Sequence, residues 1–255
     1  MRIRRGLGIL LLLGVSLWAG PPKGPVPLAI AAAADLRGSL EELAETFQKV
    51  NPAVRIQVSY GASGGLAAQI EQGAPFDLFL SADLGYPERL VQAGLTTQEG
   101  VSRYATGELI LWVRKELARK EGLQVLTNPA IKRIAQANPR LAPYGRAGEE
   151  ALKKSGLYGA VQARLIFAEN VTQAAQYLST GAAEAGLISR SQARQQTLRE
   201  TGWVWPVPQE FYTPLQQGAV VLARTTYPNE ARAFLAYLLG PSGQAILARN
   251  GFGKP

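Results

Sequence analysis

The stretch VPLAIAAAADLRGSLEELAETF (residues 26–47) joins an apolar run to a helical pattern. Residues 26–33 are almost entirely apolar and predict a buried strand. The helix that follows has apolar positions spaced i, i+3, i+4 and i+7, which give it one buried face. These positions are Leu40, Leu43, Ala44 and Phe47. The same order of strand and helix recurs in residues 54–73 and 76–93, and three such units predict a parallel sheet covered by helices.

The middle of the chain repeats this organisation and indicates a second lobe. Two long apolar strands, at 107–113 and 217–223, flank this part and are natural crossing points between two α/β lobes. The further strands expected between them cover residues 131–135, 164–168 and 185–189, and the helices cover residues 146–154 and 171–178. We therefore expect a first lobe of residues 28–106 and 224–255 and a second lobe of residues 107–223.

The N-terminus has the order of a secretory signal peptide. Three arginines (Arg2, Arg4 and Arg5) precede an apolar stretch at 7–19, which is short for a membrane span of about 20 residues. We expect a signal peptide over residues 1–19, with a retained membrane anchor as the alternative. A Pro-rich, extended linker is expected at 20–27. The mature protein should then work in the periplasm or otherwise outside the cytoplasmic membrane.

The composition excludes several kinds of chemistry. The 255 residues include no Cys and no His, so thiolate nucleophiles, imidazole bases and Cys or His metal ligands are absent. The net charge of +8, about +5 without the leader, is not gathered into a basic stripe with aromatic residues. Nucleic acid is therefore a poor candidate partner, whereas a small anion suits the mildly basic chain.

Five turns at expected strand ends are rich in Ala, Ser and Gly. Ligands of open α/β sheets bind beyond the carboxyl ends of the strands, where helices begin. Each helix start offers N–H groups without intrahelical partners and a dipole that favours anions. The alternative for any one turn is an ordinary capped connection. The turns are residues 31–39, 59–67, 80–85, 142–148 and 168–174.

GASGG (residues 61–65) matches the G-x-S-x-G pattern of hydrolase nucleophiles, between a strand and a helix. The corresponding triad needs a His to accept the serine proton, and the chain has none. No S-x-x-K occurs that would suggest a Ser–Lys hydrolase. We interpret Ser63 as a hydrogen-bond donor at a helix start, with a plain N-cap as the alternative.

In this order the turns resemble those of the periplasmic molybdate-binding proteins of ABC importers. The stretches that carry the resemblance are AQIEQGAPFDLFLSAD (68–83), LAPYGRAGEEAL (141–152) and ENVTQAAQYLSTGAAEAGL (169–187). The resemblance implies a two-lobed α/β fold, the type II periplasmic-binding-protein fold, with mixed sheets flanked by helices and a ligand cleft between the lobes. It further implies a monomeric solute-binding protein without cofactor or catalysis, which captures molybdate or tungstate and delivers it to a membrane permease.

The resemblance also assigns the site residue by residue. Ser63 would donate through its hydroxyl and N–H, and Ala82 and Val171 through their N–H groups. Tyr144 would donate its N–H, and its hydroxyl can reach the ligand in one branch of the family. Some members have a ligand-binding Tyr where this chain has Ser189. No cationic metal site is implied, because the metal enters only inside the oxyanion.

Asp35 departs from the family pattern, in which Ser or Asn is common at this position. Unit charges 4 Å apart interact by about 4 kcal/mol at an effective dielectric constant of 20, and a dianion doubles this repulsion. We therefore expect Asp35 to turn away as a helix N-cap, leaving its own N–H or that of Ala34 to the ligand, or else to be protonated. Arg37 could offset its charge. The complete set of expected ligand-binding residues is Ala34, Asp35, Ser63, Ala82, Tyr144 and Val171.

Other functions stay open from sequence alone. A receptor for sulfate, phosphate or a small carboxylate is the nearest alternative. A hydrolase that uses Ser63 or carboxylates, and a metal receptor that uses Tyr and carboxylates, are more distant ones. Four aromatic residues could line the cleft or pack in the core: Trp203, Trp205, Phe211 and Tyr212.

Overall fold

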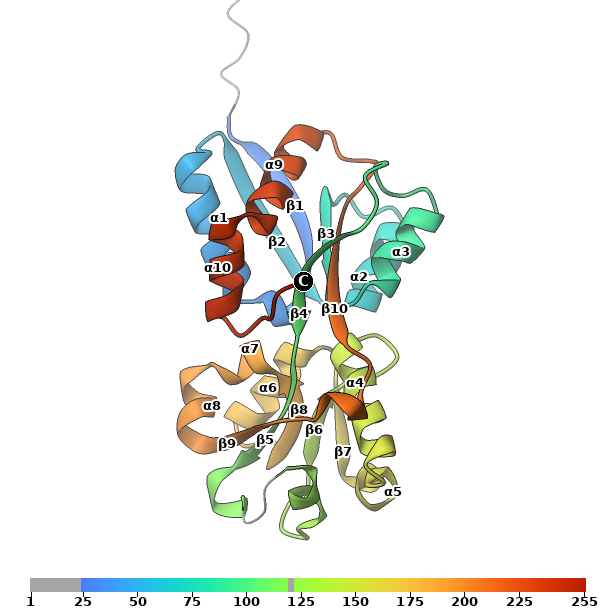
Figure 1. The fold of residues 1–255 in the computed structure, drawn as a ribbon, viewed down its shortest axis with the longest axis vertical. Coiled ribbons are helices and arrows are strands. Elements are labelled where there is room, and N and C mark those ends of the chain that lie inside the picture. Colours follow the sequence, from blue (N-terminus) through green and yellow to red (C-terminus); the bar gives the residue numbers. More distant parts are fainter. Residues whose placement is uncertain (1–23, 119–121) are drawn as a thin grey trace, which may run out of the picture.

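The computed structural model describes residues 24–118 and 122–255 as two lobes, one above the other in Figure 1. The expected signal peptide and residues 20–23 of the expected linker lie outside the described residues. The last two residues of that linker, Val26 and Pro27, already belong to strand β1 (Val26–Ala33). In the described ranges no helix combines the length and apolar character needed to span a membrane.

The first lobe has a five-stranded mixed sheet in the order β2-β1-β3-β10-β4. β1, β2 and β3 are parallel, and β10 runs antiparallel to both β3 and β4. The strands besides β1 are β2 (Val54–Gly61), β3 (Leu78–Ser81), β4 (Ser102–Gly107) and β10 (Leu215–Val221). The three βα units predicted from residues 26–93 are thus confirmed.

Two layers of helices cover this sheet, one on each face (Figure 1). Leu28 and Ile30 of β1 share a core with Leu40, Phe47 and Phe234 on one face, whereas Ala31 packs with the opposite layer. This alternation is the two-residue period of a strand that is buried on both faces. The helices are α1 (Ser39–Val50), α9 (Pro228–Leu239) and α10 (Pro241–Arg249) on one face, and α2 (Ser63–Glu71) and α3 (Gly85–Gln92) on the other.

The second lobe has the strand order β7-β6-β8-β5-β9, with β5 antiparallel to β8 and β9. Trp112 on β5 fills the core, where its indole N–H donates to the carbonyl of Leu198 at 2.8 Å. The strands are β5 (Leu109–Arg114), β6 (Ile134–Ala137), β7 (Leu165–Ala168), β8 (Ala185–Ser189) and β9 (Gly202–Pro206). The helices are α4 (Pro143–Lys154), α5 (Tyr158–Val161), α6 (Val171–Ser179), α7 (Arg190–Ala193) and α8 (Gln196–Thr201).

The two crossings between the lobes lie close to, but not at, the expected positions. The long strand expected at 107–113 divides at Gly107 and Glu108, where β4 of the first sheet ends and β5 of the second begins. β10 pairs only within the first sheet, so the chain returns to the first lobe before Leu215, earlier than the expected residue 223. An apolar run shows that a strand is buried, but it does not show which sheet the strand joins.

Two elements of the second lobe are displaced from their expected bounds. β6 begins at Ile134, three residues later than expected, because residues 131–133 have no regular secondary structure. α4 begins at Pro143, three residues earlier than expected. Proline suits the first helical position because its missing N–H would be unpaired there in any case. This earlier start brings Tyr144 into the first turn of a helix.

Candidate functional site

The five turns singled out in the sequence meet at one small cavity between the lobes. β1 and β3 of the first sheet, and β6 and β7 of the second, end at this junction, so residues that follow strands far apart in the chain become neighbours. The cavity is lined by Ala33, Ala34, Asp35, Gly61, Ala62, Ser63, Ala82, Ala142, Pro143, Tyr144, Asn170 and Val171. All six residues expected at the site are among them.

Three helices begin at the cavity wall. α2 starts at Ser63 and α6 at Val171, while Tyr144 is the second residue of α4. The N–H groups of a first helical turn have no intrahelical partner and carry the positive end of the helix dipole. The cavity therefore receives uncharged donors from both lobes, an arrangement suited to a small anion.

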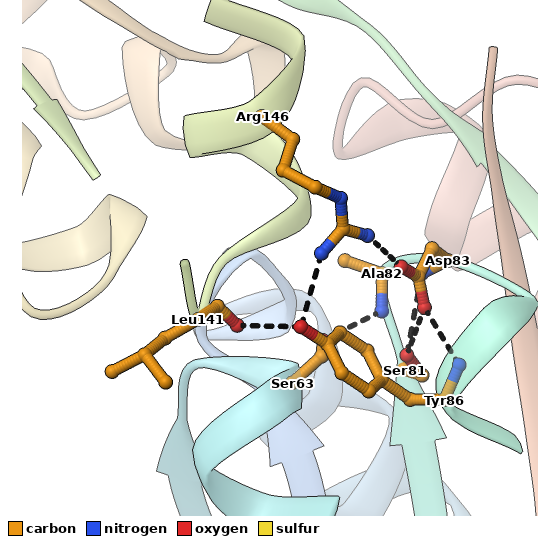
Figure 2. Close-up of polar contacts among 7 residues, drawn as sticks. All are labelled: Ser63, Ser81, Ala82, Asp83, Tyr86, Leu141 and Arg146. Carbon is orange, nitrogen blue, oxygen red and sulfur yellow. Dashed lines mark hydrogen bonds and ion pairs between the residues drawn. The ribbon is translucent and has the colours of Figure 1, made fainter. Parts of the chain in front are cut away.

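Ser63 is buried, and its hydroxyl oxygen accepts a hydrogen bond from the N–H of Ala82 at 3.0 Å (Figure 2). The hydroxyl hydrogen remains available to a guest in the cavity. Ala62, not Ser63, is the N-cap of α2, so the alternative of a plain cap is wrong. Asn170 is the residue that caps a helix here, because its side chain accepts from the N–H of Gln173.

Asp35 is fully buried in the short 3₁₀ helix η1 (Ala34–Leu36), and the expectation that it caps a helix is wrong. Its Oδ2 accepts from the side-chain amide of Gln217 at 2.5 Å. Burial raises the pKa of Asp35 to about 6, although the hydrogen bonds of the Gln217 and Tyr144 side chains oppose this rise. The expectation that Arg37 offsets its charge is also wrong, because Arg37 lies over the Tyr60 ring.

Tyr144 supplies a hydroxyl beside Asp35. Burial and the neighbouring Asp35 carboxyl raise the Tyr144 pKa well above 10, so this group remains a neutral donor. Its hydroxyl packs against Gly107, where a side chain would collide with it and with the amide of Gln217. Tyr104 is buried near Asp35 and donates its hydroxyl to the carbonyl of Ser81 at 3.0 Å. Sequence reasoning missed Gln217 and Tyr104, because both lie in strands and not in a turn.

The lobes touch directly around the cavity. The N–H of Gly64 in the first lobe donates to the carbonyl of Leu141 in the second at 2.9 Å. Arg146 of α4 pairs with Asp83 and donates to the Tyr86 hydroxyl at 3.0 Å, so it bridges the lobes beside the cavity (Figure 2). The structure is therefore a closed form, in which cavity residues of both lobes are held together.

The aromatic residues near the second crossing lie away from the cavity lining. Trp203 is 56% exposed on β9. Tyr212 is buried, and its hydroxyl accepts from the N–H of Leu109 at 3.2 Å, where it ties the two crossing segments together. Within residues 24–118 and 122–255, no cluster of three or more acidic, Cys or His side chains could hold a metal ion.

Two α/β lobes joined by two crossing segments, with a small cavity between their helix starts, define a solute-binding protein of the two-lobed, type II periplasmic-binding-protein fold. Residues 28–253 match the family described as bacterial extracellular solute-binding protein, and the chain belongs to this family. Within it, the chain falls among the relatives of the molybdate-binding proteins named ModA, as the sequence resemblance implied.

Individual comparisons agree with this assignment. The chain is 35% identical to the molybdate-binding protein ModA of Azotobacter vinelandii, over 88% of both chains, and 31% identical to that of Rhodobacter capsulatus, over 95% of this chain and 92% of the relative. The solved periplasmic molybdate-binding protein of Azotobacter vinelandii superimposes with a TM-score of 0.84, at 34% identity, over 89% of this chain and 99% of that one. The sulfate-binding protein SubI of Mycobacterium tuberculosis shares the fold alone, at 18% identity and a TM-score of 0.71.

Proposed function

We propose that this protein captures molybdate in the cavity between its lobes and delivers it to the membrane permease of an ABC importer. The observation that carries the proposal is the convergence of helix starts from both lobes on one small, buried cavity. The names of the relatives, molybdate-binding proteins at 35% and 31% identity, select the guest among small anions. Tungstate, which has the same shape and charge, should bind as well.

Neutral donors hold the oxyanion in this proposal. Ser63 offers its hydroxyl and N–H, and Val171 offers its N–H. The N–H of Ala82 donates to the Ser63 hydroxyl oxygen in this structure, and in this proposal the anion becomes its acceptor. Tyr144 contributes its N–H and its hydroxyl. No Lys or Arg is among the lining residues. Fixed N–H and O–H groups in a site shielded from water stabilise a buried anion without a counter-charge, and the cavity size then selects the guest.

The same residues serve binding and not catalysis. The Ser63 hydroxyl oxygen accepts from the N–H of Ala82. Asp35, the one carboxyl group among the lining residues, is paired with Gln217 and not with Ser63. A bound anion contacts both lobes and so favours the closed form, which is the form that a permease can distinguish from the empty protein. We further propose export through residues 1–19, a monomeric state and no cofactor.

Calorimetric titration and thermal unfolding with molybdate, tungstate, sulfate and phosphate test the proposal. Molybdate and tungstate should bind and raise the unfolding midpoint, since ligand at 1,000 times its Kd stabilises the folded state by about 4 kcal/mol. If sulfate or phosphate binds more tightly than molybdate, that oxyanion is the ligand of this protein. No binding of any of the four would reject the proposal.

A further inference from the structure

The cavity that is proposed to hold a dianion is itself lined by a carboxyl group. Asp35 lines the cavity and has no exposed surface. Its Oδ2 accepts from Gln217, whereas Oδ1 is buried without a partner of good hydrogen-bond geometry among the described residues. The Tyr144 hydroxyl and the backbone N–H groups of Asp35 and Leu36 lie near the carboxyl group and lower its pKa, but not enough to offset its burial. An unpartnered buried oxygen is costly, and it marks a position where a bond forms only when something else is present.

Asp35 cannot easily turn away from the cavity. The carbonyl of Ala34 accepts from Thr172 at 2.9 Å and from Gln192 at 3.1 Å, both in the second lobe. The carbonyl of Asp35 itself accepts from the hydroxyl of Ser191 at 2.8 Å. These three bonds fix the backbone of η1 in the closed form. The carboxyl group must therefore be accommodated next to the guest and not moved aside.

Among the residues that the structure describes, no cation is paired with this carboxyl group. The ionisable groups that face it are Tyr144 from α4 and Tyr104 from β4, and burial raises the pKa of both well above 10. The neighbouring arginines are already paired. Arg37 pairs with Glu41, Arg146 with Asp83 and Arg190 with Glu108.

We propose that Asp35 binds the anion as a neutral carboxylic acid, which donates a hydrogen bond from Oδ1 to an anion oxygen. This inference rests on the proposed function and adds that binding of the anion is coupled to protonation of Asp35. Each dianion that enters takes one proton from solvent onto Asp35, so the bound complex carries one negative charge fewer than with an ionised carboxylate. Asp35 then acts as a further donor of the site, equivalent to a hydroxyl.

The required protonation is accessible near neutral pH. Because burial raises the pKa of Asp35 to about 6 in the empty protein, holding the proton at pH 7 costs only about tenfold in affinity. Above that pH the affinity should fall about tenfold for each further pH unit. An exported protein experiences the pH of its surroundings, so this coupling would make capture stronger in mildly acidic surroundings.

Calorimetry on the mature protein between about pH 6.5 and pH 8.5 tests the inference, because free molybdate is a dianion throughout this range. The affinity of the wild type should fall roughly 75-fold across it. At the upper end, titrations in two buffers with different ionisation enthalpies should report uptake of close to one proton per molybdate. Asp35→Asn should bind molybdate with an affinity independent of pH and without proton uptake, because its amide donates at every pH.

Asp77→Asn is the matched control. Asp77 is the other buried carboxylate among the described residues, and it accepts from the N–H of Ala29 far from the cavity lining. This variant should keep the proton uptake of the wild type. If the wild type binds molybdate without proton uptake, the inference is overturned and the proposed function stands. If it binds no molybdate at any pH, both are overturned. These two outcomes need no variant and hold even if Asp35→Asn does not fold.

Discussion

Arg146 of the second lobe and Asp83 of the first form an ion pair across the cleft, directly beside the cavity. Arg146 also donates to the hydroxyl of Tyr86, which belongs to the first lobe. Both contacts exist only while the lobes are closed. They therefore stabilise the closed form relative to the open one and leave each lobe's own core unchanged.

Replacing this arginine should weaken ligand retention. Arg146→Met should lower molybdate affinity by about fivefold, mainly through faster release, because a partly exposed ion pair contributes about 1 kcal/mol. The control is Arg89→Met, since Arg89 also lies over the Tyr86 ring but pairs with Glu71 within the first lobe. Stopped-flow measurements of the molybdate release rate of both variants check the prediction. Equal release rates would show that Arg146 does not stabilise the closed form.

Removing the Ser63 hydroxyl should affect binding far more than folding. Ser63→Ala deletes the acceptor of the Ala82 N–H and a donor to the anion, and we expect molybdate affinity to fall about 10-fold to 100-fold. Ser39→Ala is the control, because Ser39 is equally buried but donates to the carbonyl of Leu36 at the start of α1. Titration of both variants gives the answer. If Ser63→Ala binds molybdate with nearly the affinity of the wild type, the anion does not contact the Ser63 hydroxyl.

The strand-and-helix order of the chain was predictable because each element buries a regular face. β1 and β8 have the bounds that their apolar runs indicate. The meeting of the turns at one cavity was also predictable, because parallel strands end at the same edge of a sheet. These features depend on local pattern and on a general rule of α/β folds.

Contacts between the lobes could not be predicted in the same way. Gln217 lies in the middle of β10, and no local pattern indicates that its amide reaches Asp35, 182 positions earlier in the chain. The surroundings of Asp35 likewise depend on the packing of η1 against the second lobe. A short 3₁₀ helix resembles a capped turn in sequence, which explains why Asp35 was expected to be an N-cap.

The buried carboxyl of Asp35 should contribute less to the stability of the empty protein as pH rises. The pKa of Asp35 is raised from 3.8 to about 6, so the folded state holds this proton more tightly than the unfolded chain does. The contribution of Asp35 to the free energy of unfolding therefore falls between about pH 4 and pH 6, by about 3 kcal/mol in total, and this loss persists at higher pH.

Asp35→Asn should remove this loss. Without ligand, the variant should be more stable than the wild type at pH 8 by up to about 3 kcal/mol, and the difference should be much smaller at pH 4. Urea unfolding at the two pH values measures it. A stability difference that does not change with pH would show that Asp35 has an ordinary pKa in the folded protein.

Glycine at position 64 lets the two lobes approach each other. A Cβ there would lie 2.8 Å from the carbonyl oxygen of Leu141 in the second lobe and 2.5 Å from the hydroxyl of Tyr86. Such distances are too short for real contacts, and the backbone carbonyl cannot move aside alone. The neighbouring Gly65 has open space around the same position. Two adjacent glycines of one helix thus differ only in what faces them.

Gly64→Ala should therefore hold the lobes slightly apart. We expect molybdate affinity to fall at least about tenfold, while the free energy of unfolding stays level or rises, because alanine favours a helix over glycine by about 1 kcal/mol. Gly65→Ala should gain the same helix stability and bind like the wild type. Titration and small-angle scattering with saturating molybdate compare the two. A Gly64→Ala protein that binds and compacts like the wild type would mean that productive closure does not need this contact.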